Sequence, residues 1–233
     1  MKDTLAYLTG RQEAGAAPVS IGRKFDAAGR VLPCAGNTML CHVDPKSEAF
    51  EALSAAQSAM KSGKFAQAFA FLPPASLHMT IFEGVIDYAR TADRWPGHIP
   101  LDASVAAVTD DVLQRLNRIR VPRAFQVKPT RLFGGFSVLM SGANSAAEAQ
   151  LRSTRDQLRL ATNLILPDHG SYSFHISFGY LLRWLADEDA RRLQDHADAV
   201  FAEFLRPLQF TLGPVEFCRF NDMYRFEALA RLT

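Results

Sequence analysis

The sequence predicts an α+β protein whose two halves repeat one order of elements: strand, helix, strand, helix and strand. Two observations lead to this prediction. The segment Ser76–Ile81 reads Ser, apolar, His, apolar, hydroxyl, apolar, and Ser173–Phe178 follows the same rule in the second half of the chain. The strands expected before these motifs and the helices expected after them recur in the same order. A duplicated unit predicts a bilobal fold with two sheets facing each other across a central cleft.

The first half is expected to begin with an N-terminal arm, 1–20, and a hairpin or tight turn within 21–32. A strand at 38–43 precedes a helix that begins at Asp44, because aspartate caps helices and proline suits the first helical position. Helix-forming residues continue to about Ala70, and Gly63 can break this stretch into two helices. The first motif strand, 76–86, a helix from Asp102 and a strand at 125–133 follow.

The second half repeats this order. A strand is expected at 136–140, and the capping-box sequence at Ser145 starts a helix that runs to about Ile165. The second motif strand is expected at 172–182 and a helix from Asp187. Three strands close the chain, at 209–212, 215–220 and 225–229. We therefore expect one bilobal domain over 21–233, with lobes of roughly 36–133 and 136–233, and we leave open an exchange of strands between the lobes.

The polar residues of each motif are expected to share one face of a strand. Successive side chains of a strand point to opposite faces, so His78 and Thr80 point one way and their apolar neighbours the other. The same holds for His175 and Ser177. We therefore expect these four side chains to face one cleft.

Composition limits the classes of partner. The 233 residues carry a net charge of +2, so no broad basic surface for long nucleic acid is expected. No apolar run reaches the length of a signal peptide or a membrane span. The three cysteines show no CxxC spacing, which favours reduced thiols. We expect a cytoplasmic monomer without a membrane partner.

Two histidines that face each other are suited to acid–base chemistry on a phosphate ester. Histidine titrates near neutral pH, so one ring can accept a proton while the other donates one. The hydroxyls of Thr80 and Ser177 can hydrogen-bond phosphate oxygens. Opening of a cyclic phosphodiester by water fits best, and it requires neither a metal nor a cofactor. The expected partner is a small nucleotide or an RNA terminus that carries a cyclic phosphate.

The paired H-x-T/S motifs resemble those of the two-histidine (2H) phosphoesterase superfamily, which includes LigT-like 2′-5′ RNA ligases and 2′,3′-cyclic-nucleotide phosphodiesterases. The stretch IGRKFDAAGRVLPCAGNTMLCHVD, together with LHMTI and FHISFGYL, is similar to a bacterial and fungal branch known as a domain of unknown function. The resemblance implies a bilobal LigT-like fold and metal-independent phosphoester chemistry. It implies His78 with Thr80 and His175 with Ser177 as the motif residues, and no particular substrate.

Three other interpretations of the motifs remain open. Each histidine can be a structural residue with a satisfied hydrogen bond. The protein can also be a nucleotide-binding or RNA-end-binding module without turnover. A metal site would need a third ligand near the histidines, and neither motif offers one at short spacing.

Other side chains are candidates for substrate contacts. Arg23 and Lys24 suit a phosphate clamp or a solvated hairpin, and His42 can reach the cleft wall or be structural. Four tyrosines can stack on a base or belong to the core. They are Tyr88, Tyr172, Tyr180 and Tyr224.

Overall fold

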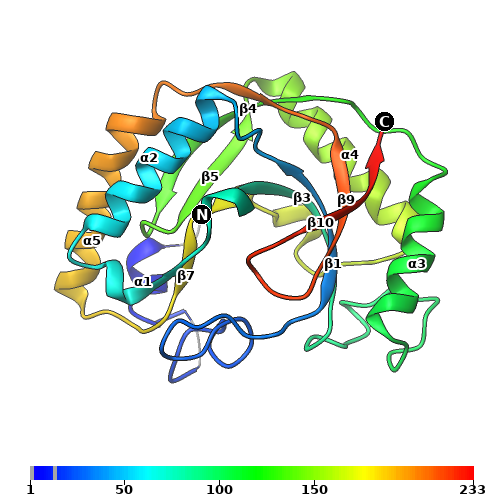
Figure 1. Ribbon diagram of the computed structural model, residues 1–233, viewed down its shortest axis with the longest axis horizontal. Helices are drawn as coiled ribbons and strands as arrows, with labels where there is room; N and C mark the ends of the chain where they lie inside the picture. The colour runs from blue at the N-terminus through cyan, green and yellow to red at the C-terminus, as the bar shows by residue number, and fades with distance from the viewer. Residues whose placement is uncertain (1–2, 13–14) are drawn as a thin grey trace.

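One curled antiparallel sheet of eight strands organises the computed structural model, which describes residues 3–12 and 15–233 (Figure 1). The strand order is β10-β9-β1-β3-β6-β5-β4-β8. The strands are β1 (Gly36–His42), β3 (His78–Ile86), β4 (Phe125–Phe133), β5 (Ser137–Gly142), β6 (His175–Ser177), β8 (Phe210–Leu212), β9 (Val215–Phe220) and β10 (Glu227–Leu232). A second, two-stranded sheet joins β2 (Phe69–Phe71) to β7 (Gly179–Leu181).

The expected mixture of helices and antiparallel strands is confirmed, but the expected pair of facing sheets is not found. The two motif strands meet at the centre of a single sheet, where Met79 of β3 pairs with Ile176 of β6. Strand β4 pairs with β5, whereas β9 pairs with β1 and β10 with β9. The expected lobes, 36–133 and 136–233, therefore do not correspond to the two halves of the sheet, because strands have been exchanged between them.

The second motif strand is shorter than the expected 172–182. It divides at Phe178 into β6 and β7, and β7 leaves the large sheet to pair with β2. A Cβ atom on Gly179 would lie only 2.6 Å from the carbonyl oxygen of Ala70, so this close strand pairing depends on glycine. The expected helical stretch to Ala70 breaks at Gly63, because the first long helix ends at Ser62 and residues 69–71 form β2.

Five α-helices surround the sheet in the described part of the chain. They are α1 (Thr4–Leu8), α2 (Glu48–Ser62), α3 (Val105–Leu116), α4 (Ser145–Thr162) and α5 (Asp187–Val200). Helices α2 and α5 lie together on one side of the molecule and α3 and α4 on the other (Figure 1). None of these helices combines the length and the apolar character needed to cross a membrane.

Three of the expected helix starts are shifted by a few residues. Ser47 caps α2 in place of Asp44, and Ser104 caps α3 in place of Asp102. The side chain of Asn144 caps α4, directly before the expected Ser145. In each case the capping oxygen accepts a backbone N–H of the first helical turn.

The motif strands turn their apolar residues toward the core, as the alternation predicts. Met79, Ile81 and Ile176 are completely buried, and α4 packs against β3. The histidine-bearing face of the sheet is therefore the opposite one.

Residues 19–34, called the N-terminal strap here, run past the sheet without regular strands (Figure 1). The expected hairpin or tight turn takes the form of two turns, with Gly22 at φ 72° and Gly29 at φ 79°. Phe25, between them, is completely buried and fixes the strap to a second, smaller apolar cluster. The expected arm, 1–20, contributes α1, while residues 1–2 and 13–14 lie outside the described residues.

Candidate active site

A cavity of about 440 Å³ lies against the polar face of the central strands. His78, Thr80, His175 and Ser177 all line it, as the alternation of the two motifs predicts. Five further residues singled out in the sequence line the same cavity: Arg23, Lys24, Tyr88, Tyr172 and Tyr180.

The strand register brings the four motif residues into one compact group. Met79 pairs with Ile176 in antiparallel register. Continued by one residue in each direction, this register sets His78 across from Ser177 and Thr80 across from His175. Residues directly opposite each other in antiparallel strands have Cβ atoms about 4.5–5.5 Å apart. Each imidazole is therefore next to the hydroxyl of the other motif.

Both imidazoles are held by the same backbone contact. Nδ1 of His78 lies 2.6 Å from the carbonyl oxygen of Ser76, and Nδ1 of His175 lies 2.9 Å from that of Ser173. A carbonyl oxygen only accepts hydrogen bonds, so Nδ1 carries the hydrogen in both rings. Nε2 is then the nitrogen that gains or loses a proton.

The surroundings of His78 favour its neutral form. The ring of Phe226, just before β10, lies 4.3 Å from the His78 ring. Burial and, to a lesser extent, the nearby charges of His42, His175 and Lys24 lower the pKa of His78 to about 4, although the hydrogen bond to Ser76 opposes the shift. At neutral pH the imidazole of His78 is therefore a neutral base.

Two of the sequence candidates lie outside the cavity lining. His42 is opposite His78 in the β1–β3 pairing, with 6.3 Å between the ring centroids, but its Nδ1 lies 2.5 Å from Oε2 of Glu216. Tyr224 is 36% exposed, and its ring is 6.2 Å from that of Phe25. Neither is part of the wall described above.

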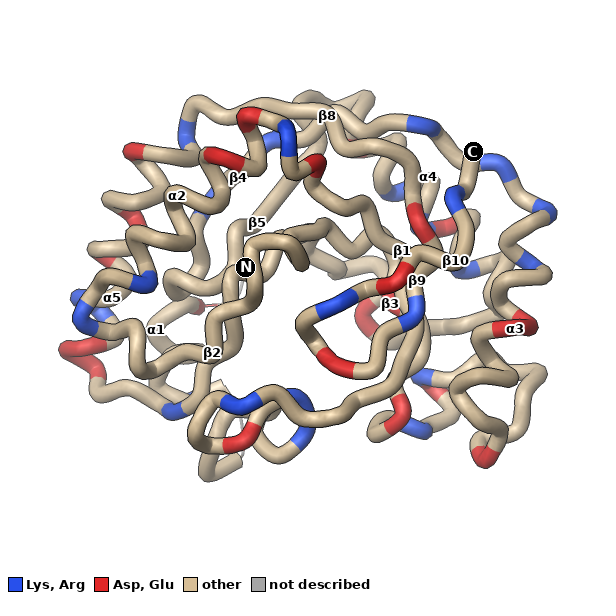
Figure 2. The backbone as a smooth tube through the Cα atoms, viewed as in Figure 1, with Lys and Arg blue, Asp and Glu red and all other residues tan. Residues whose placement is uncertain are grey.

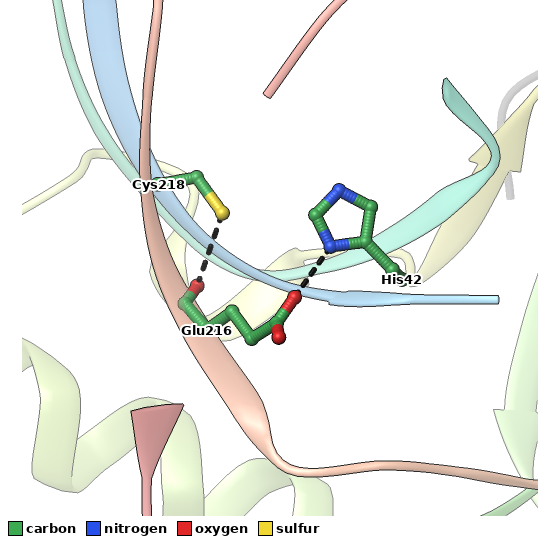
Figure 3. A group of neighbouring side chains, drawn as sticks. All are labelled: His42, Glu216 and Cys218. Atoms are coloured by element: carbon green, nitrogen blue, oxygen red, sulfur yellow. Dashed lines mark hydrogen bonds and ion pairs between the residues drawn. The ribbon is translucent and has the colours of Figure 1, made fainter. Parts of the chain in front are cut away.

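His42, Glu216 and Cys218 form the one group with metal-ligand chemistry in the described chain (Figure 3). The ligand atoms of this group already have partners within the protein. Burial raises the pKa of the Cys218 thiol to about 12. Nδ1 of His42 and one oxygen of Glu216 already bond each other, and Arg231 donates to the other oxygen at 2.8 Å. The group is a hydrogen-bonded cluster beside His78.

Sequence reasoning missed the residues that build the far end of the cavity. Glu83 lines it, and Arg155 of α4 lies behind, 3.5 Å from the Glu83 carboxylate. Arg155 is 1% exposed, donates to the carbonyl oxygen of Ile81 at 2.6 Å and stacks 3.7 Å from the ring of Tyr172. Burial raises the pKa of Glu83, while Arg155 opposes that shift. Only the fold brings these residues together, and no short motif marks them.

Comparisons with known proteins identify the family to which the chain belongs. Residues 24–134 match a family described as 2H-phosphodiest, a domain of unknown function (DUF1868). The fold is similar to the crystal structure of ATU0111, a conserved protein of unknown function from Agrobacterium tumefaciens. The two chains are 31% identical over 99% of each, with a TM-score of 0.92. A comparison with curated proteins found no match.

A two-histidine phosphoesterase is the class that the fold and the paired motifs define. The chain belongs to the 2H-phosphodiest family, within the 2H phosphoesterase superfamily. This membership indicates phosphoester hydrolysis as the general chemistry.

Proposed function

We propose that the protein is a phosphodiesterase that opens a cyclic phosphate at a nucleotide or at an RNA end. One observation carries the proposal. Two His-hydroxyl pairs from neighbouring strands line one cavity, and both imidazoles are fixed through Nδ1 so that Nε2 handles the proton. A cyclic phosphodiester needs a base for the incoming water and an acid for the departing ribose oxygen, and this arrangement supplies one group for each.

His78 acts as the base in this proposal and His175 as the acid. Nε2 of His78 takes a proton from water as the water oxygen bonds to phosphorus. The bond from phosphorus to one ribose oxygen breaks, and that oxygen takes the proton from Nε2 of His175. The product is a phosphate monoester with a free neighbouring hydroxyl. His78 has the base role because the pKa of about 4 keeps its ring neutral.

Thr80 and Ser177 hold the phosphate between the two rings. Each hydroxyl lies on the histidine-bearing face and lines the cavity. Each can donate a hydrogen bond to a non-bridging oxygen, where negative charge builds in the transition state. Their contribution is smaller than that of the histidines, because a neutral hydroxyl neither accepts nor supplies the reacting proton.

The test is incubation of the purified protein with each of the four 2′,3′-cyclic nucleotides, with chromatographic separation of the products. We expect a nucleoside monophosphate from at least one of them, and none from a His78→Ala/His175→Ala double variant. If no cyclic nucleotide is opened but nucleotides still bind in the cavity, the protein is a binding module and the hydrolytic proposal is wrong.

A further inference from the structure

Lys24 brings a positive charge from the N-terminal strap to the wall of the same cavity. Its backbone is fixed on both sides. The N–H of Lys24 donates to the carbonyl oxygen of Ser20 at 2.9 Å, and its own carbonyl accepts from the N–H of Leu32 at 2.8 Å. Phe25, the next residue, is completely buried. The strap therefore holds the side chain of Lys24 in a defined place.

The ammonium of Lys24 has a neutral partner. Nζ donates to the hydroxyl of Tyr180 at 3.3 Å and lies 4.8 Å from the centre of that ring. The Tyr180 hydroxyl donates its own hydrogen to Sδ of Met223 at 3.4 Å, so it receives the Lys24 proton as an acceptor. Within residues 3–12 and 15–233, no carboxylate forms an ion pair with Lys24.

Lys24 is nevertheless charged. Burial lowers the pKa of its ammonium, but the phenols of Tyr180 and Tyr88 outweigh that effect, and the pKa is raised. Burial by itself disfavours the ammonium, because the lost hydration is not replaced by the opposite charge of a carboxylate. An anion in the cavity would supply that charge. Basic and acidic residues both occur along the backbone, the strap included (Figure 2).

We propose that Lys24 binds a non-bridging oxygen of the substrate phosphate, and that Tyr180 positions its ammonium for this contact. The proposal rests on the phosphodiesterase function above and adds a third phosphate-binding element, which comes from the strap and not from the motif strands. Lys24 lies near enough to the reacting group for its charge to act on His78. Arg23, its neighbour, is exposed and lies 5.6 Å from the ring of Tyr88, at the rim of the cavity.

The experiment compares Lys24→Met, which keeps the length of the side chain and removes its charge, with the wild type. Lys128→Met is the matched control, because Lys128 is exposed on β4 and does not line the cavity. The first measurement is the binding of inorganic phosphate. It is monitored through the rise in melting temperature that phosphate causes. A hydrogen bond to a charged group corresponds to about 10–100-fold in affinity. We expect Lys24→Met to weaken phosphate binding by this factor and Lys128→Met to leave it unchanged.

Tyr180→Phe separates positioning from direct contact. It keeps the ring and removes the hydroxyl that accepts from Lys24. We expect weaker phosphate binding than in the wild type, with a smaller loss than for Lys24→Met. Lys24→Arg, which retains the charge, is expected to recover part of the affinity and serves as the test variant should Lys24→Met not fold.

The second measurement, hydrolysis of a cyclic nucleotide, distinguishes failure of this inference from failure of the proposed function. If the wild type opens a cyclic nucleotide while Lys24→Met has unchanged KM, kcat and phosphate affinity, Lys24 is structural and the inference is wrong. If the wild type hydrolyses nothing but binds phosphate through Lys24, the inference stands and the proposed reaction fails. If Lys24→Met melts at a lower temperature than the wild type but binds phosphate with the same affinity, Lys24 is again structural and the inference is wrong.

Discussion

The two halves of the site share a backbone arrangement and differ in their surroundings. His78 and His175 each bond through Nδ1 to the carbonyl oxygen two residues earlier, and each is followed by a hydroxyl residue on the same face. His78 belongs to a nine-residue strand and lies under the ring of Phe226. His175 belongs to a three-residue strand, and its ring lies 6.1 Å from the ring of Tyr172.

This difference shows how a duplicated motif can divide its chemistry. The motif fixes the tautomer and the direction of each ring, whereas the elements packed around the ring set its affinity for protons. Phe226 comes from near the end of the chain and packs against the ring of His78. We therefore expect the two histidines to be equally necessary and not interchangeable.

The largest expected effect follows from removing either imidazole. General acid–base groups contribute about 10²–10⁴-fold to a rate, so His78→Ala and His175→Ala should each lower kcat for cyclic-nucleotide hydrolysis by a factor in this range. Because the two act in one step, the double variant should lose less than the product of the single losses. Steady-state kinetics on folded variants measures both. A His175→Ala protein as fast as the wild type would refute the paired site.

The next effect tests the environment of His78. In Phe226→Ala, water reaches the imidazole and its pKa should rise from about 4 toward the ordinary value of about 6.5. The base must be neutral, so a higher pKa protonates it at pH 5 but not at pH 8. We expect kcat/KM to fall about tenfold or more at pH 5 and to change little at pH 8. If the ratio of kcat/KM at pH 5 to kcat/KM at pH 8 is the same in Phe226→Ala and in the wild type, Phe226 does not control the pKa of His78.

The hydroxyls should contribute less than the rings. A neutral hydrogen bond contributes about 0.5–1.5 kcal/mol, which corresponds to about 2–10-fold. Thr80→Ala and Ser177→Ala should each lower kcat/KM by such a factor. Because each hydroxyl is next to the opposite histidine in the strand register, the two losses should be similar. Thr80→Ser and Ser177→Thr, which keep the hydroxyl, are the controls and should retain most of the activity.

The smallest expected effect concerns the cluster of His42, Glu216 and Cys218. Its thiol has a raised pKa and its carboxylate is already shared by His42 and Arg231. We expect EDTA and Cys218→Ala to leave the hydrolysis rate unchanged. Loss of activity with EDTA, followed by recovery with zinc or manganese, would move the chemistry to a metal centre.

The sequence was sufficient to predict the four motif residues but not their surroundings. Alternation within one strand is a local property, so the shared face of His78 and Thr80 could be predicted from a few consecutive residues. The division of the second motif strand at Phe178 could not, because it depends on the distant contact of Gly179 with Ala70.

The same limit applies to the residues around the cavity. Phe226 reaches His78, and Glu216 reaches His42, across large separations in the chain, and neither belongs to a recognisable motif. His42 is expected on the strand before the first long helix, but only the structure shows that this strand pairs with β3 and that the side-chain partner of His42, Glu216, lies on β9. The helix ends at Ser62 with Gly63 as its C-cap, so the break considered at Gly63 is found, and only residues 69–71 pair with β7 against their helix propensity.

The most direct test of the division between the two histidines is the pH dependence of kcat/KM for the wild type and for each single alanine variant. In a bell-shaped profile, the acid limb reports the base and the alkaline limb reports the acid. We predict a wild-type acid limb near pH 4, the pKa of His78. The residual activity of His78→Ala should lose the acid limb, and that of His175→Ala should lose the alkaline limb. The opposite assignment of limbs, or two variants with identical profiles, would contradict the account.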